Sequence, residues 1–152
     1  MVIGVGNEFR GDDGAGLVVI DLLGQWLGDR VRLVKSDGEP ASLIDAWRDA
    51  DLAIVVDAVA CDPATPGRTH LLELEAGDEA GLRRAVSSHG LGIGTAISLG
   101  RVLRLLPGKL IVRAIEVADV NFGGGLNSPV KAAAELTASA ILGDLGIGQV
   151  AG

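Results

Sequence analysis

The sequence predicts an α/β fold, a three-layer α/β/α sandwich around a mostly parallel sheet of about five strands. Aliphatic runs alternate with helical patterns along the chain, as is typical of parallel sheets covered by helices on both faces. Hydrophobic residues make up 48% of the chain although aromatic residues make up only 3%, so we expect a core of Val, Ile, Leu and Ala. No internal repeat or linker interrupts the 152 residues, and we expect residues 1–152 to form a single domain.

The expected strands are short aliphatic runs, and the expected helices place apolar residues at three-and-four spacing. In chain order, the strands lie at residues 2–5, 31–34, 52–56, 70–74 and 110–115. The helices lie between and after them, at residues 13–27, 41–49, 78–86, 91–106 and 129–142. Asp12 is the expected cap of the first helix, and Pro129 is the expected first residue of the last helix.

Charge and composition exclude several classes of protein. The net charge is −7 and the thirteen basic residues are scattered, which argues against nucleic-acid binding because phosphate contacts need clustered Lys and Arg. No apolar stretch reaches the ~20 residues of a membrane-spanning helix, so we expect no membrane insertion. Cys61 is the single cysteine, and the apolar start of the chain lacks the basic region of an export signal. We therefore expect a cytoplasmic protein.

Polar side chains gather where the predicted strands end. They are Asn7, Asp12 and Asp13 after the first strand, Asp37 and Glu39 after the second, Asp57 after the third, and Glu116 after the fifth. The carboxyl ends of parallel strands point the same way, and ligand crevices form just outside them. Carboxylates that repel one another are seldom gathered unless a cation, a shared proton or a basic group lies among them. The sequence therefore predicts an acidic pocket at this edge.

The glycine-rich first turn does not fit a nucleotide site. After Gly4 and Gly6, Phe9 stands where the dinucleotide-binding fingerprint needs its third glycine. Asp12 and Asp13 would also place negative charge against a pyrophosphate at the helix N-terminus. The chain has no phosphate-loop motif either.

Three side chains of this edge are candidates for metal binding. If Asp12 caps the first helix, Asp13 can project into the crevice and meet a cation. Asp57 ends an otherwise apolar strand, and the simpler reading is a carboxylate bonded to the following turn. His89 lies among Ser and Gly residues that permit close approach, and imidazole joins carboxylates in nickel or zinc sites, although a lone loop histidine is usually a surface residue. His70 looks like an ordinary strand residue and Cys61 like an incidental loop cysteine.

Three segments resemble the signatures of the hydrogenase maturation proteases. The opening segment, residues 4–16, is similar to the first and most specific signature, Gly4-Val5-Gly6-Asn7-Glu8-Phe9-Arg10-Gly11-Asp12-Asp13-Gly14-Ala15-Gly16. The second and third signatures are matched, in order, by Val55-Val56-Asp57-Ala58 and Ser88-His89-Gly90-Leu91-Gly92. The length and the order of strands and helices agree with the family as well.

The resemblance implies an endopeptidase that removes the C-terminal extension of a nickel-iron hydrogenase large-subunit precursor after nickel insertion. It places Asp13, Asp57 and His89 on the family's metal-binding positions. The metal is expected to be the precursor's own nickel, used for recognition, and another divalent metal can occupy the site in vitro. Because no Ser, Cys or Thr nucleophile with an adjacent base is apparent, we expect water to attack, activated by Asp13 and Asp57. Whether the chemistry is aspartic or metal-assisted stays open.

The turn after the second strand departs from the family pattern. We expect Asn7, Asp37, Gly38 and Glu39 to contact substrate, but Glu39 and Pro40 replace the Gly-Thr part of an Asp-Gly-Gly-Thr turn. The change in shape and charge points to a different choice of hydrogenase. Two alternatives remain: a non-proteolytic nickel-binding chaperone or sensor, and a peptidase of unrelated substrate on the same scaffold.

Overall fold

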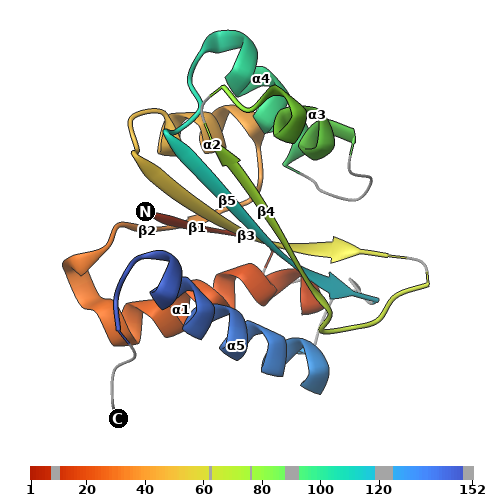
Figure 1. Cartoon of the computed structure of the whole chain (residues 1–152). Coiled ribbons are helices and arrows are strands. Elements are labelled where there is room, and N and C mark those ends of the chain that lie inside the picture. The colour runs from red at the N-terminus through yellow and green to blue at the C-terminus, as the bar shows by residue number, and fades with distance from the viewer. Residues whose placement is uncertain (8–10, 62, 76, 88–92, 119–124, 149–152) are drawn as a thin grey trace.

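The computed structural model describes residues 1–7, 11–61, 63–75, 77–87, 93–118 and 125–148 (Figure 1). Its strands are β1 (Val2–Val5), β2 (Leu33–Ser36), β3 (Leu52–Ala60), β4 (Thr69–Glu75) and β5 (Lys109–Val117). Its α-helices are α1 (Ala15–Leu27), α2 (Pro40–Trp47), α3 (Glu79–Ser87), α4 (Gly94–Leu103) and α5 (Ser128–Asp144). Two short 3₁₀-helices, η1 (Gly11–Gly14) and η2 (Gly28–Arg30), flank α1.

The strands form one sheet in the order β2-β1-β3-β5-β4. β2, β1, β3 and β5 are parallel, whereas β4 runs antiparallel to β5 at one edge. Helices α1 and α5 cover one face of the sheet, and α2, α3 and α4 cover the other (Figure 1). The predicted three-layer α/β/α sandwich with a mostly parallel five-stranded sheet is confirmed.

The central strand β3 is buried on both faces and divides the hydrophobic core in two. Ile54 and Val56 pack with the residues of α1 and α5, whereas Ala53 and Val55 pack with those of α2 and α4. This is the alternation expected of a strand between two helical layers. It fixes the face of Asp57, which follows Val55 by two residues and so belongs to the face covered by α2, α3 and α4.

The start of α1 lies directly on the end of β1 and the middle of β3, and two glycines permit this approach. A Cβ atom on Gly16 would lie 2.6 Å from the carbonyl oxygens of both Val5 and Val56. A Cβ atom on Gly4 would lie 2.3 Å from the carbonyl oxygen of Gly16. Any side chain at these positions would push α1 off the sheet, so both glycines fix where the η1 turn sits.

Several predicted details were wrong. Asp12 does not cap α1: the η1 turn comes first, and the N-cap is Gly14, which has no side-chain cap bond. Pro129 is the second residue of α5, after Ser128. β3 continues to Ala60, so Asp57 lies within the strand and not at its end. Among the described residues, no helix combines the length and the hydropathy required to cross a membrane.

Candidate active site

Asp57 is the acidic side chain placed most centrally at the predicted edge. It follows Val56, whose partner in β1 is Gly4, one residue before the end of that strand. Asp57 is only 6% exposed, and the residues on both sides of it in β3 are aliphatic. A carboxylate this deep in a sheet is costly unless it is paired, and such positions are typical of functional sites.

The backbone brings the Asp13 turn to the same place. Asp13 lies in η1, which contacts β3, and Gly16 holds the following turn of α1 against Val56. The side chains of Asp12 and Asp13 and the whole of His89 fall outside the described residues. The convergence of Asp13, Asp57 and His89 on one metal therefore stays a prediction. Within the part of the chain that is described, no three His, Cys, Asp or Glu side chains are grouped to hold a metal ion.

The turn between β2 and α2 is organised by its own carboxylates. Glu39 is the N-cap of α2, and its carboxylate accepts hydrogen bonds from the backbone N–H groups of Ala41 and Ser42 at 3.1 and 3.0 Å. These bonds lower the pKa of Glu39. Asp37 Oδ1 accepts the backbone N–H of Glu39 at 3.0 Å. The carboxylate of Glu39 is thus engaged in capping, which gives the Glu39-Pro40 departure from the family pattern a structural role.

Gly38 belongs to this turn, and Asn7 follows the neighbouring strand β1. Gly38 has φ +89°, and a Cβ atom there would lie 3.0 Å from Cγ1 of Val5. Asn7 is exposed, two residues after the end of β1. The candidate substrate residues from β1 and β2 therefore lie beside one another, because these strands are paired from Val2↔Leu33 to Val5↔Ser36.

A second acidic centre lies further along the same edge, around Glu116 of β5. Glu116 is 5% exposed. Its carboxylate is hydrogen-bonded to Nε2 of His70 in β4, at a distance of 2.9 Å. The backbone N–H of Thr65 lies 3.5 Å from the carboxylate, and Nε of Arg68 lies 3.6 Å from it. The pKa of Glu116 is lowered, mainly by the His70 hydrogen bond, so the carboxylate stays ionised at neutral pH.

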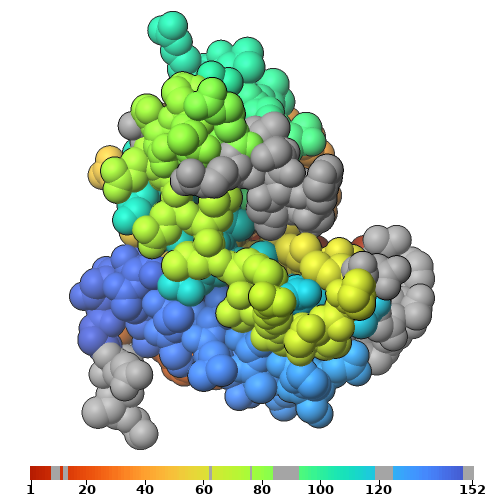
Figure 2. Space-filling model, turned by 45° about the vertical axis from the view of Figure 1, so that its right-hand side comes forward, coloured from red at the N-terminus to blue at the C-terminus, as the bar shows by residue number. Residues whose placement is uncertain are grey.

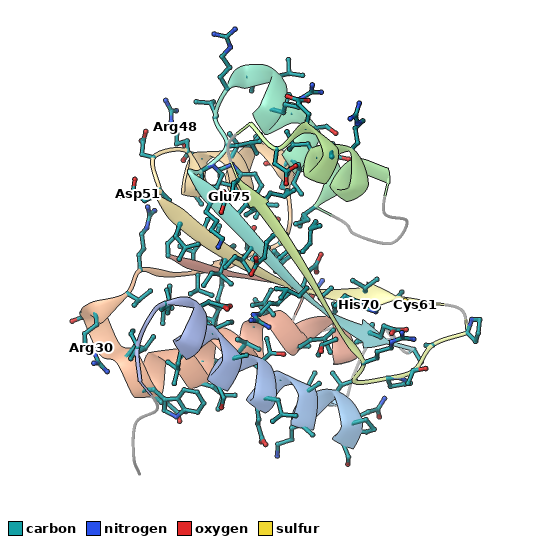
Figure 3. The ribbon with its side chains drawn as sticks, in the orientation of Figure 1. Arg30, Arg48, Asp51, Cys61, His70 and Glu75 are labelled. Carbon is teal, nitrogen blue, oxygen red and sulfur yellow. The ribbon has the colours of Figure 1, made fainter. Side chains whose placement is uncertain are left out.

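The prediction that His70 is an ordinary strand residue was incomplete. Its partner is 46 residues away in the sequence, and only the antiparallel pairing of β4 with β5 brings the two together. A partial signal was nevertheless present: Glu116 interrupts an aliphatic run between Ile115 and Val117. Figure 3 shows His70 and Cys61 at the same end of the sheet, beyond the helices that cover its middle.

Cys61 belongs to the Glu116 centre but is not activated by it. Burial raises the pKa of the Cys61 thiol, and its hydrogen bond to Glu116 raises it further. A thiol held protonated beside a carboxylate is a poor nucleophile. This agrees with the interpretation of Cys61 as a residue without a catalytic role.

Comparison with known proteins decides the family. The family model described as "HycI: Hydrogenase maturation protease" matches residues 23–144, most of the chain. The chain belongs to the hydrogenase maturation protease family. The matched region includes Asp57 and the Glu116 centre, whereas the opening signature with Asp13 precedes it.

Individual members of this family show similar sequences and folds. The hydrogenase expression/formation protein HupM of Azotobacter chroococcum mcd 1 is 30% identical over 142 residues, which cover 89% of this chain and 66% of HupM. The hydrogenase maturating endopeptidase HybD from Escherichia coli superposes with a TM-score of 0.75 at 25% identity, covering 95% of this chain and 90% of HybD. A hydrogenase 2 maturation peptidase from Thaumarchaeota archaeon SCGC_AB-539-E09 gives a TM-score of 0.71 at 26% identity, with 97% of both chains covered. The chain spans slightly less than two thirds of the length of HupM.

Proposed function

We propose that this protein is an endopeptidase that removes the C-terminal extension of a nickel-iron hydrogenase large-subunit precursor after nickel has been inserted. The observation that carries the proposal is the buried Asp57 of β3, a strand that contacts the η1 turn containing Asp13. Membership in the maturation protease family supports it, as does the name of the similar HybD, a hydrogenase maturating endopeptidase. The reaction is expected in the cytoplasm, where a single unpaired cysteine is stable.

Recognition of the precursor is assigned to Asp13, Asp57 and His89. Two carboxylates and one imidazole suit nickel and leave coordination positions open for the ligands with which the precursor already holds the metal. The nickel thus belongs to the substrate, and another divalent metal can replace it in vitro. The contact between η1 and β3 supports this assignment, because it brings the two segments that carry Asp13 and Asp57 together.

Hydrolysis requires a base that takes a proton from the attacking water. The only thiol in the chain, Cys61, has a raised pKa, so a cysteine nucleophile does not fit. Asp57 or Asp13 serves as the general base, since a positioned carboxylate can take a proton from the attacking water. Asn7 and the Asp37–Gly38 turn follow the paired strands β1 and β2. We expect them to orient the peptide, together with the backbone of Glu39.

The test is cleavage of a nickel-loaded large-subunit precursor beside a nickel-free precursor. We expect the wild-type protein to clip only the loaded form, and Asp57→Asn and Asp13→Asn to lower the rate by about 10²–10⁴-fold. Asp45→Asn is the matched control, because Asp45 is an exposed residue of α2. Equal cleavage by Asp57→Asn and Asp45→Asn would refute the assignment of Asp57.

The same measurement separates the binding-protein alternative. If nickel binds and Asp57→Asn weakens that binding, yet neither precursor is clipped, the chain acts as a nickel-binding chaperone or sensor. If the nickel-free precursor is cleaved at the same rate, nickel is not needed for recognition, and the protein is a peptidase that does not check for the metal.

A further inference from the structure

One row of residues across the sheet connects Asp57 to His70. Ala114 of β5 is paired with Asp57 of β3 on one side and with His70 of β4 on the other. Residues paired directly across strands project to the same face of a sheet. Val55 and Val112, two residues earlier on their strands, lie in the core beneath α2, α3 and α4, so the row belongs to that face.

The spacing of this row matches a bound peptide. Neighbouring strands lie about 4.8 Å apart, so the backbones of Asp57 and His70 are roughly 10 Å from each other. An extended peptide rises about 3.3 Å per residue, so this distance corresponds to about three residues of substrate. Ala114, which separates the two, is only 2% exposed, whereas the side chain of His70 is 49% exposed.

Glu116 fixes the orientation of His70. It follows Ala114 by two residues, so it lies on the same face of β5, and it holds Nε2 at 2.9 Å. In the tautomer in which Nε2–H donates a hydrogen bond to this carboxylate, Nδ1 carries no proton and can accept a hydrogen bond. His70 remains 49% exposed at its side chain while Glu116 is 6% exposed. A buried carboxylate that orients an accessible imidazole is an arrangement found where an imidazole must meet a ligand in one geometry.

The position of β4 makes this imidazole accessible to a large partner. β4 is the edge strand of the sheet. Figure 2 shows β4 and the segment leading into it, yellow to lime, at the surface between the green α3 above and the blue α5 below. A protein substrate can therefore reach His70 and the edge of the sheet from the same side.

We propose that His70 is a substrate-binding residue of the peptidase centre and that Glu116 is its positioning residue. His70 Nδ1 accepts a backbone N–H of the extended precursor segment, about three residues from the bond cleaved beside Asp57. This inference rests on the proposed function, because it takes Asp57 as the centre of cleavage. It adds a specificity-determining contact from the edge strand to the residues assigned above.

Two variants of His70 separate this role from a purely structural one. The amide of His70→Gln takes the place of Nε2, so it keeps the bond to Glu116 and loses the acceptor at Nδ1. The amide of His70→Asn takes the place of Nδ1, so it keeps an acceptor there and loses the bond to Glu116. Glu73→Gln is the control, because Glu73 is exposed on β4 and points to the opposite face.

KM, kcat and Tm are measured for each variant with the nickel-loaded precursor. We expect His70→Gln to keep the wild-type Tm and to raise KM by roughly three- to tenfold with little change in kcat, as for one lost neutral hydrogen bond. His70→Asn should lower Tm, and its KM should also rise because the bond to Glu116 that positions the side chain is lost. Glu116→Gln should raise KM in the wild-type background but add nothing to His70→Gln. If His70→Gln had the same Tm and the same KM as the wild type, the inference would be overturned.

Binding of the uncleaved precursor distinguishes failure of the inference from failure of the proposed function. If the wild type does not clip the precursor, the peptidase proposal fails. The dissociation constant of the precursor is then compared between the wild type and His70→Gln. Weaker binding by His70→Gln would uphold the contact, whereas equal binding would refute it.

Discussion

The two helices that begin at the carboxyl edge of neighbouring strands start in different ways. α1 follows β1 through the η1 turn, its N-cap is Gly14 without a side-chain bond, and it is positioned by the contact of Gly16 with Val5 and Val56. α2 follows β2 through Asp37 and Gly38, and it is capped by the carboxylate of Glu39. One turn is held by close backbone packing and the other by a side chain.

The difference teaches which carboxylates of an acidic edge are open to function. A carboxylate that accepts two backbone N–H groups at a helix start, as Glu39 does, completes the local structure. At the start of α1 the N-cap is a glycine, which supplies no side-chain bond, and close packing of Gly16 positions the helix. This difference agrees with the proposal that the Asp13 turn has a catalytic role and the Glu39 turn a supporting one.

The largest effect should come from filling the contact that holds α1. Gly16→Ala places a Cβ atom 2.6 Å from two backbone oxygens, and it should lower the free energy of unfolding by about 2–3 kcal/mol. Gly24→Ala is the control on the same helix, because its Cβ atom would meet only Cδ1 of Leu33 at 3.8 Å and should stabilise by about 0.5–1 kcal/mol. Urea unfolding measures both. Similar stabilities of the two variants would show that backbone packing does not position α1.

A smaller effect is expected at the corresponding glycine of the second turn. Gly38 has φ +89°, which alanine adopts at a cost of about 1–2 kcal/mol. The Cβ atom would lie 3.0 Å from Cγ1 of Val5. This side-chain atom can shift by a few tenths of an ångström, unlike the backbone oxygens that face Gly16. Gly38→Ala should therefore lose less stability than Gly16→Ala in the same urea series. A larger loss would mean that the β2–α2 turn is the less adaptable of the two.

The smallest effect concerns the cap of α2 and depends on pH. The folded-state pKa of Glu39 is lowered, so its carboxylate stabilises the protein above the ordinary glutamate pKa of about 4.3, and this stabilisation is lost as the pH falls through the folded value. Glu39→Gln should lower Tm by about 2–4 °C at pH 7. The difference from the wild type should shrink below about pH 4.

Ser42→Ala is the control for the cap, because it removes only the exposed hydroxyl that donates to Glu39 at 3.1 Å. Its effect on Tm should be within about 1–2 °C and nearly independent of pH. A pH-independent loss in Glu39→Gln would show that the charge of the cap is unimportant.

Local pattern was sufficient for the elements because each strand and helix carries its own periodicity. The aliphatic run that contains Val55 and the spaced apolar residues of α1 can be recognised without knowledge of their partners. Helix starts were less predictable. Asp12 has the residue type of a cap, but Gly16 packs so closely on the sheet that the chain first forms the η1 turn. Packing from distant residues overrode the local preference.

The sequence by itself determined the layered α/β fold, the acidic edge and the family resemblance, because hydrophobic periodicity and short motifs are properties of adjacent residues. Only the tertiary structure decided that β4 pairs antiparallel with β5, that His70 meets Glu116, and that both share a face with Asp57. The physical reason is that strand order and register are fixed by packing both faces of the sheet at once, which no single segment specifies.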